Sequence, residues 1–109
     1  MKLILAVIQH EDEGALTEAM ELEGMSVTRI GSSGGFLRAS NVTLMTAVED
    51  QQVKQVMALL GKHCKRRTKK AHPRAPSTQA PERFLGAIPV QIGGATVFIL
   101  SLERVEKIG

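Results

Sequence analysis

A short glycine-rich stretch carries the residue types that could bind a ligand. In G-S-S-G-G-F-L-R-A-S-N, Gly34 and Gly35 stand directly before Phe36 and Leu37. Consecutive glycines allow positive φ angles and leave backbone N–H groups uncovered, so a turn here can form a cluster of donors that suits a phosphate. The Phe and Leu side chains offer apolar surface to a planar base, and Asn41 offers an amide that can pair with a base edge. The stretch therefore predicts a nucleotide pocket.

The same stretch also has a purely structural interpretation. A hairpin connection between two strands uses glycines too, and its Phe side chain can fold back onto the core. Two adjacent glycines are only weakly specific for a phosphate site, so the residues alone leave both interpretations open.

The rest of the chain offers little catalytic chemistry. His10, His63 and His72 are scattered, and no Cys/His pairing has the spacing of a metal site. No Walker A loop, GxGxxG motif or nucleophile elbow is present. We therefore expect no enzyme, no bound metal and no cofactor.

The lone cysteine, Cys64, cannot build a disulfide framework within the chain. Its neighbours are Lys62, Lys65, Arg66 and Arg67, and nearby cations can lower the pKa of a thiol. The same cysteine is the last position of an apolar helical stripe, which predicts a buried thiol instead. Both interpretations stand at this stage.

Length and composition indicate one globular domain. The chain has 109 residues, of which 43% are hydrophobic and 23% charged. The apolar start, M-K-L-I-L-A-V-I, is typical of a buried first strand rather than a targeting peptide. No apolar run approaches the roughly 20 residues that a membrane span requires, so we expect a cytoplasmic protein that does not bind membranes.

The charge is unevenly distributed along the chain. Residues 62–74, K-H-C-K-R-R-T-K-K-A-H-P-R, hold seven of the fourteen Lys and Arg and no acid, so the remainder has seven bases against eleven acids. Such a segment could contact nucleic acid, nucleotide phosphates or an acidic protein, or it could be a solvated run. No aromatic residues interleave with the bases, which weakens the case for single-stranded nucleic acid.

Patterns of apolar residues predict the order of the elements. Strands are expected at 3–8, 25–30, 41–48, 84–92 and 95–102. A first helix follows His10 and is closed by Gly24, and a second runs from an N-cap at Asp50 to Cys64. A long basic, Pro-containing loop is expected at about 64–84.

This order is β-α-β-β-α-β with one extra strand, the ferredoxin-like arrangement of an α+β protein. Two helices cover only one face of such a sheet, yet L-I-L-A-V-I and A-T-V-F-I-L are apolar on both faces. We therefore expect a homo-oligomer whose sheets pack together, the alternative being a monomer with a partly apolar surface.

Three segments resemble the cyclic di-AMP receptor family of PII-like signal proteins. They are M-K-L-I-L-A-V-I-Q, T-R-I-G-S-S-G-G-F-L-R-A-S-N-V-T and G-G-A-T-V-F-I-L, and the similarity runs along nearly the whole chain. The resemblance implies a single PII-like domain over residues 1–109 that assembles as a homotrimer. It also implies a non-enzymatic protein that binds cyclic di-AMP at subunit interfaces and signals to a protein partner through changes in a mobile loop.

The resemblance also assigns residues to the ligand site. The pocket would be lined by Thr28, Gly34, Gly35, Phe36, Leu37 and Asn41, with Arg38 and Lys107 as nearby cations and Phe98 from the neighbouring chain. The chain departs from the family pattern at Gly24 and Ser26, where members tend to carry Asn and Arg. Ser40 and Ala47 replace glycines, and Lys107 falls near a ligand-contacting glutamine.

These departures leave two alternatives for the function. The first is a PII-like trimer that binds another nucleotide, such as ATP. The second is a protein that binds nucleic acid or another anionic partner through residues 62–74.

Overall fold

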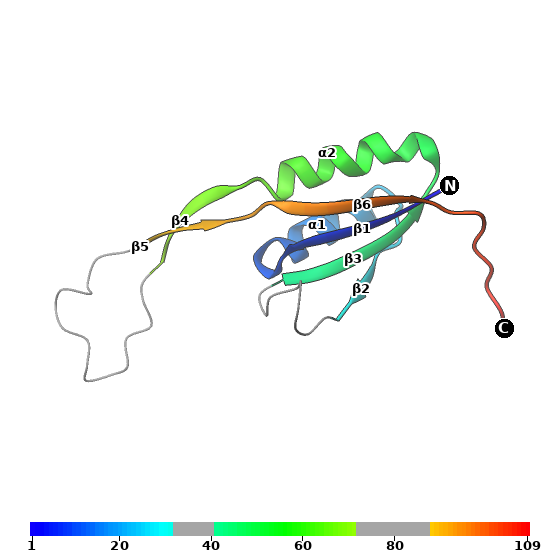
Figure 1. The fold of residues 1–109 in the computed structure, drawn as a ribbon, viewed down its shortest axis with the longest axis horizontal. Helices are drawn as coiled ribbons and strands as arrows, with labels where there is room; N and C mark the ends of the chain where they lie inside the picture. The colour runs from blue at the N-terminus through cyan, green and yellow to red at the C-terminus, as the bar shows by residue number, and fades with distance from the viewer. Residues whose placement is uncertain (32–40, 72–87) are drawn as a thin grey trace.

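The computed structural model of the chain describes residues 1–31, 41–71 and 88–109, which form an α+β fold (Figure 1). The elements are β1 (Lys2–Gln9), α1 (His10–Leu22), β2 (Thr28–Ile30), β3 (Asn41–Val48), the 3₁₀ turn η1 (Asp50–Gln52), α2 (Val53–His63), β4 (Arg67–Ala71), β5 (Ile88–Ile92) and β6 (Ala95–Ser101). Within these described ranges, neither helix is long and apolar enough to cross a membrane.

Four strands form the main sheet in the order β2-β3-β1-β6, and all neighbouring strands are antiparallel. This arrangement is consistent with the ferredoxin-like fold expected from the sequence. The expected strand at 41–48 is confirmed as β3. The one expected at 25–30 begins only at Thr28, because the Met25 N–H donates to the Met20 carbonyl oxygen and still closes α1.

The helices end and begin as local chemistry requires. Gly24 closes α1 as expected, at a φ of +81° that favours glycine, and its N–H donates to the Glu21 carbonyl oxygen. The expected N-cap at Asp50 is wrong by one residue. Glu49 caps the 3₁₀ turn η1 that precedes α2, because the side chains of Glu49 and Gln52 exchange hydrogen bonds with each other's backbone N–H in a capping box.

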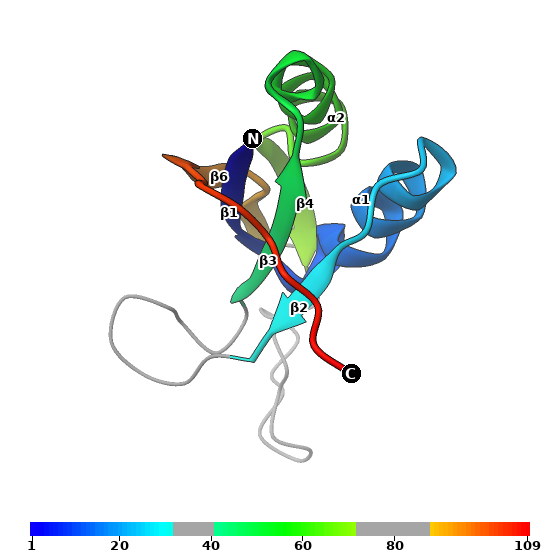
Figure 2. The ribbon, with the colours of Figure 1, turned by 90° about the vertical axis from the view of Figure 1, so that its right-hand side faces the viewer.

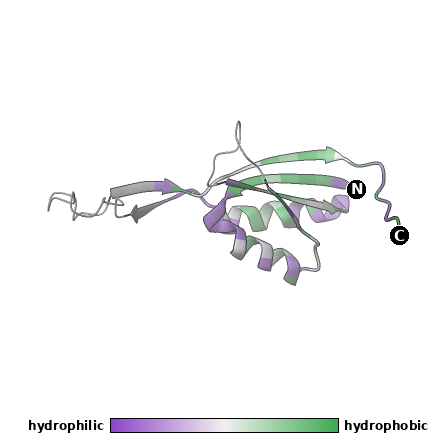
Figure 3. Cartoon of the chain, turned by 90° about the horizontal axis from the view of Figure 1, so that it is seen from below, coloured by the Kyte–Doolittle hydropathy of each residue, from purple (hydrophilic) through white to green (hydrophobic). Residues whose placement is uncertain are grey.

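Both helices cover the same face of the sheet (Figures 2 and 3). The core lies between them and that face. It is formed by Ile4, Ala6, Ile8, Leu16, Met20, Met25, Val42, Leu44, Val48, Val56, Leu60 and Cys64. Burial of these side chains is the main term that holds α1 and α2 on the sheet.

Within the described part of the chain, the other face of the sheet carries no helix and is largely apolar. Successive residues of a strand point to opposite faces of the sheet. The residues of β1 and β3 that alternate with the core residues therefore point away from the helices, as do the residues of β6 that pair with them. We call this the open face, and its members include Leu3, Leu5, Val7, Met45, Phe98 and Leu100. Phe98 and Leu100 are 45% and 46% exposed.

A second, two-stranded sheet projects from the body as an arm (Figure 1), formed by β4 paired with β5. The prediction of a loop at about 64–84 is therefore wrong for Arg67–Ala71, which form a strand. That segment, R-T-K-K-A, lacks the apolar alternation of a half-buried strand and takes its ladder hydrogen bonds from β5. The rest of the expected loop, residues 72–84, lies outside the described residues.

Candidate functional site

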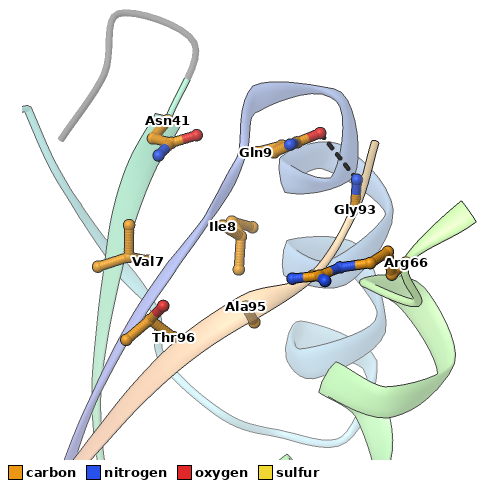
Figure 4. A pocket seen from close by; sticks show the side chains of 9 residues that line it. Val7, Ile8, Gln9, Asn41, Arg66, Gly93, Ala95 and Thr96 are labelled. Atoms are coloured by element: carbon orange, nitrogen blue, oxygen red, sulfur yellow. Dashed lines mark hydrogen bonds between the residues drawn. The ribbon is translucent and has the colours of Figure 1, made fainter. Parts of the chain in front are cut away.

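A cavity of about 210 Å³ lies where the ends of several elements meet (Figure 4). It is bounded by the end of β1, the start of β3, the junction between α2 and β4, and the turn between β5 and β6. Its lining residues are Val7, Ile8, Gln9, Asn41, Arg66, Gly93, Gly94, Ala95 and Thr96. The cavity is thus lined mainly by polar groups, among them amide, hydroxyl and guanidinium groups.

The turn between β5 and β6 depends on Gly93. Its φ is +89°, and a Cβ at this position would meet the Lys65 carbonyl oxygen and the Arg67 guanidinium. Its N–H donates to Gln9 Oε1 at 2.8 Å (Figure 4), and the N–H of Gly94 donates to the Cys64 carbonyl oxygen. These two bonds fasten the turn to the end of β1 and to the end of α2.

An ion pair lies beside the cavity and anchors the base of the arm. Arg67 Nη2 donates to Asp12 Oδ1 at 2.7 Å, while Nη1 donates to the Lys65 carbonyl oxygen at 2.9 Å. Asp12 is 3% exposed, and its hydrogen bond raises the pKa of Arg67 above its usual value. Arg67 therefore neutralises a buried carboxylate of α1 and holds the first residue of β4 against that helix.

Cys64 is buried at the end of α2, as the helical stripe predicted. Burial raises the pKa of its thiol to about 11, and the negative charge of Asp12 acts in the same direction, while Arg67 opposes it. The interpretation that nearby cations lower this pKa was wrong, because desolvation outweighs the one cation that matters. The thiol is protonated at neutral pH and is a poor nucleophile.

The predicted site residues fall into three groups. Asn41 lines the cavity, at the first position of β3 and opposite Gln9 in the register with β1. Thr28 lies on β2, Phe98 on β6, and Lys107 is exposed in the segment that follows β6, all three away from the cavity lining. Gly34, Gly35, Phe36, Leu37 and Arg38 lie outside the described residues.

Thr28 and Phe98 occupy opposite edges of one row across the open face. Thr28 pairs with Met45, Met45 with Leu5, and Leu5 with Phe98. Two residues at the ends of such a row are separated by three inter-strand spacings, or about 14 Å. We call this set of four the edge-to-edge row. Thr28 and Phe98 of one chain are thus too far apart for a single base to contact both.

Arg29 lies on the opposite face of β2 from Thr28, as strand alternation requires. Arg29 Nε lies 2.7 Å from Glu13 Oε2 on α1, so its side chain is on the helix-covered side of β2. Arg29 is therefore engaged by α1 rather than directed to the open face.

Four further residues of the cavity were not expected as site residues from the sequence: Gln9, Arg66, Gly93 and Thr96. The signal for two of them was present in G-G-A-T-V-F, which supported the family resemblance. Arg66 stood in the basic segment without any sign that it would differ from its neighbours. Over the ranges that the structure describes, no group of three or more His, Cys, Asp or Glu is placed to hold a metal ion.

Comparisons with known proteins point to one family. The sequence model of a family described as cyclic-di-AMP receptor matches residues 1–108. Among solved structures, the chain is similar to the crystal structure of a functionally unknown protein from Pediococcus pentosaceus, with a TM-score of 0.76 and 28% sequence identity. That likeness covers 98% of this chain and 96% of the other.

Proposed function

Since the chain belongs to the cyclic-di-AMP receptor family over residues 1–108, we propose that it is a non-enzymatic signalling protein that binds cyclic di-AMP. The family match carries this proposal, and it supports a nucleotide-binding protein more broadly. Signalling would take place in the cytoplasm and pass to a protein partner.

The chemistry of the cavity supports a nucleotide as ligand. Asn41 and Gln9 carry amides that can pair with base edges, and Arg66 carries a cation for a phosphate. The cavity of about 210 Å³ is smaller than the roughly 300–1,000 Å³ of pockets that enclose a drug-sized ligand. It therefore suits one part of a dinucleotide, and the other part must contact a different surface.

We propose that a neighbouring subunit supplies that surface in a homotrimer. The open face is apolar and carries no helix, which supports packing against other copies of the chain. The edge-to-edge row supports a shared site, because Thr28 and Phe98 can meet one base only if they come from different chains. Residues 34–38 and Lys107 remain part of the proposed site through the resemblance alone.

A calorimetric titration with cyclic di-AMP tests the proposal. We expect saturable binding with about one ligand per subunit, the stoichiometry of three equivalent shared sites in a trimer. The absence of heat and of any thermal stabilisation at high ligand concentration would reject cyclic di-AMP as the ligand.

Binding of another nucleotide, such as ATP, is the second candidate. The cavity favours it through one observation: the groups that line it can bind a phosphate and a base without requiring two nucleotides. A thermal-shift competition separates the candidates. For a cyclic di-AMP receptor, ATP in excess should leave the shift caused by cyclic di-AMP unchanged.

Nucleic-acid binding through residues 62–74 receives less support. Within the described part of this segment, Arg67 is engaged by Asp12, Cys64 is buried, and Arg66 lines the cavity. The cations are thus divided among different sites rather than aligned along one groove. We expect no retardation of DNA or RNA by the protein at low salt, where phosphate contacts are strongest.

A further inference from the structure

Two adjacent arginines at the base of the arm have different environments. Arg67 is paired with Asp12 and with a backbone carbonyl. Arg66, within the ranges that the structure describes, has neither a hydrogen-bond nor an ion-pair partner, and it lines the cavity that also contains Asn41. Arg66 is solvent-exposed, and its guanidinium group brings five donors to this cavity that are open to an anionic ligand.

The backbone beside Arg66 leaves room for its guanidinium. Nε and Nη2 of Arg66 lie 3.7 Å from the point where a Cβ of Gly94 would stand. Since Gly94 has a φ of +89°, the turn favours glycine there and the guanidinium lies directly over the bare backbone. Figure 4 shows the side chain reaching from the base of β4 toward β6 near Ala95.

The charge of the lining residues selects the class of ligand. Arg66 is the one formally charged residue among the nine, and none is acidic. The nearest buried carboxylate to the arm base, Asp12, is already paired with Arg67 at 2.7 Å. The cavity therefore presents a net positive charge together with the amides of Gln9 and Asn41. A phosphate oxygen pair matches the planar fork of a guanidinium, and the positive charge favours an anion over a cationic ligand.

We infer that Arg66 binds a phosphate group of the ligand and, through its place immediately before β4, links the bound ligand to the β4–β5 arm. The inference rests on the proposed function in taking a nucleotide as the ligand. It goes further in naming the residue that receives the phosphate and the element that responds. The residue after Arg66 is Arg67, which is already paired with Asp12 of α1. A phosphate bound to Arg66 would therefore hold the base of the arm at a second point.

Calorimetry on Arg66→Ala, Arg66→Lys and Lys65→Ala tests the phosphate contact. Lys65 is the adjacent exposed cation outside the cavity lining, so Lys65→Ala makes the same change in net charge. We expect Arg66→Ala to bind cyclic di-AMP about 10- to 100-fold more weakly. Arg66→Lys should fall between it and the wild type. Lys65→Ala should stay within about twofold of the wild type.

Hydrogen exchange of the arm tests the link. Cyclic di-AMP should slow exchange of the backbone N–H groups of β4 and β5 in the wild-type protein. At equal saturation, Arg66→Ala should show less of this protection, because its ligand lacks the contact at the arm base. Equal protection in both proteins would overturn the link to the arm.

The outcomes distinguish this inference from the proposed function. If the wild type binds cyclic di-AMP and Arg66→Ala binds it equally well, the phosphate contact is overturned while the proposed function stands. If the wild type does not bind cyclic di-AMP, the proposed function fails, and the same three variants are titrated with ATP. Loss of ATP affinity in Arg66→Ala alone would support the phosphate contact, whereas equal affinities or no binding would overturn it.

Discussion

At the scale of single residues, the thiol of Cys64 predicts how stability depends on pH. Its pKa is raised from 9.0 to about 11 in the folded protein, so the folded state keeps a proton that the unfolded state releases above pH 9. The stabilisation from this group is complete below pH 9 and is lost as pH rises toward 11.

The measurement is the free energy of unfolding in urea between pH 9 and 11, for the wild type and for Cys64→Ala. The decline with pH should be steeper in the wild type, since other titrating groups are common to both proteins. Parallel curves would contradict the raised pKa.

Phe98 predicts the contribution of stacking to binding. Replacement by Ala should weaken the binding of cyclic di-AMP about 5- to 150-fold, because base–aromatic stacking contributes about 1–3 kcal/mol per base. Ile99 is a matched control, since it is 46% exposed against 45% for Phe98 but points to the other side of β6. Calorimetry should find Ile99→Ala close to the wild type, and an unchanged affinity in Phe98→Ala would remove the stacking role.

The sequence predicted Asn41 as a site residue but not Gln9 or Arg66, for a physical reason. An amide beside a glycine-rich stretch is recognisable from residue types that lie close together in the chain. Gln9 and Arg66 enter the cavity only because Gly93 and Gly94 are folded against both, and this contact joins positions 84 residues apart. Within a run of seven bases, nothing in the local sequence separates the arginine that faces a cavity from the one that pairs with a buried acid.

At the scale of elements, the β5–β6 turn should tolerate no side chain at Gly93. Gly93→Ala must relieve a contact with the Lys65 carbonyl oxygen at a φ of +89°, and we expect a loss of about 1–3 kcal/mol in the free energy of unfolding. Gly61 lies within α2 with nothing within 4 Å of an added Cβ, so Gly61→Ala should stabilise by about 0.5–1 kcal/mol. Urea denaturation measures both, and equal effects would contradict the turn geometry.

The Asp12–Arg67 ion pair joins α1 to the arm, and we expect it to contribute to the free energy of unfolding. Arg67→Met should unfold at lower urea concentration than the wild type, because it leaves the buried Asp12 carboxylate without its cation. The double variant Asp12→Asn with Arg67→Met should recover part of that loss, since it also removes the buried charge. A double variant less stable than Arg67→Met would contradict the assigned role of the pair.

The elements of the body were predictable, whereas in the arm only β5 falls within an expected strand, the one at 84–92. α1, β3 and α2 each have a periodic apolar pattern that one buried face imposes, and β1 is a continuous apolar run, so their order and type followed from the sequence. The sequence of β4, R-T-K-K-A, has no such apolar pattern. Its strand conformation comes from pairing with β5, a partner that local sequence does not identify.

At the scale of the whole molecule, the open face predicts the state of assembly. The wild-type protein should elute as a trimer by light scattering coupled to size-exclusion chromatography. Leu100→Glu should shift it toward the monomer, because a carboxylate on the open face would be desolvated on packing.

Met57 on α2 provides the control, because it is apolar and 40% exposed but lies on a helix. Met57→Glu should leave the trimer intact. A wild type that is monomeric at the concentrations used for binding, or a Leu100→Glu variant that stays trimeric, would reject the open face as the interface.

The edge-to-edge row has a consequence for binding in a trimer. Each chain would lend its Thr28 edge to one site and its Phe98 edge to another, so no site belongs to a single chain. By mass action, dilution of the protein would then lower its apparent affinity, and added ligand would hold the three chains together. If one chain were lost, only the site between the two remaining chains would stay complete.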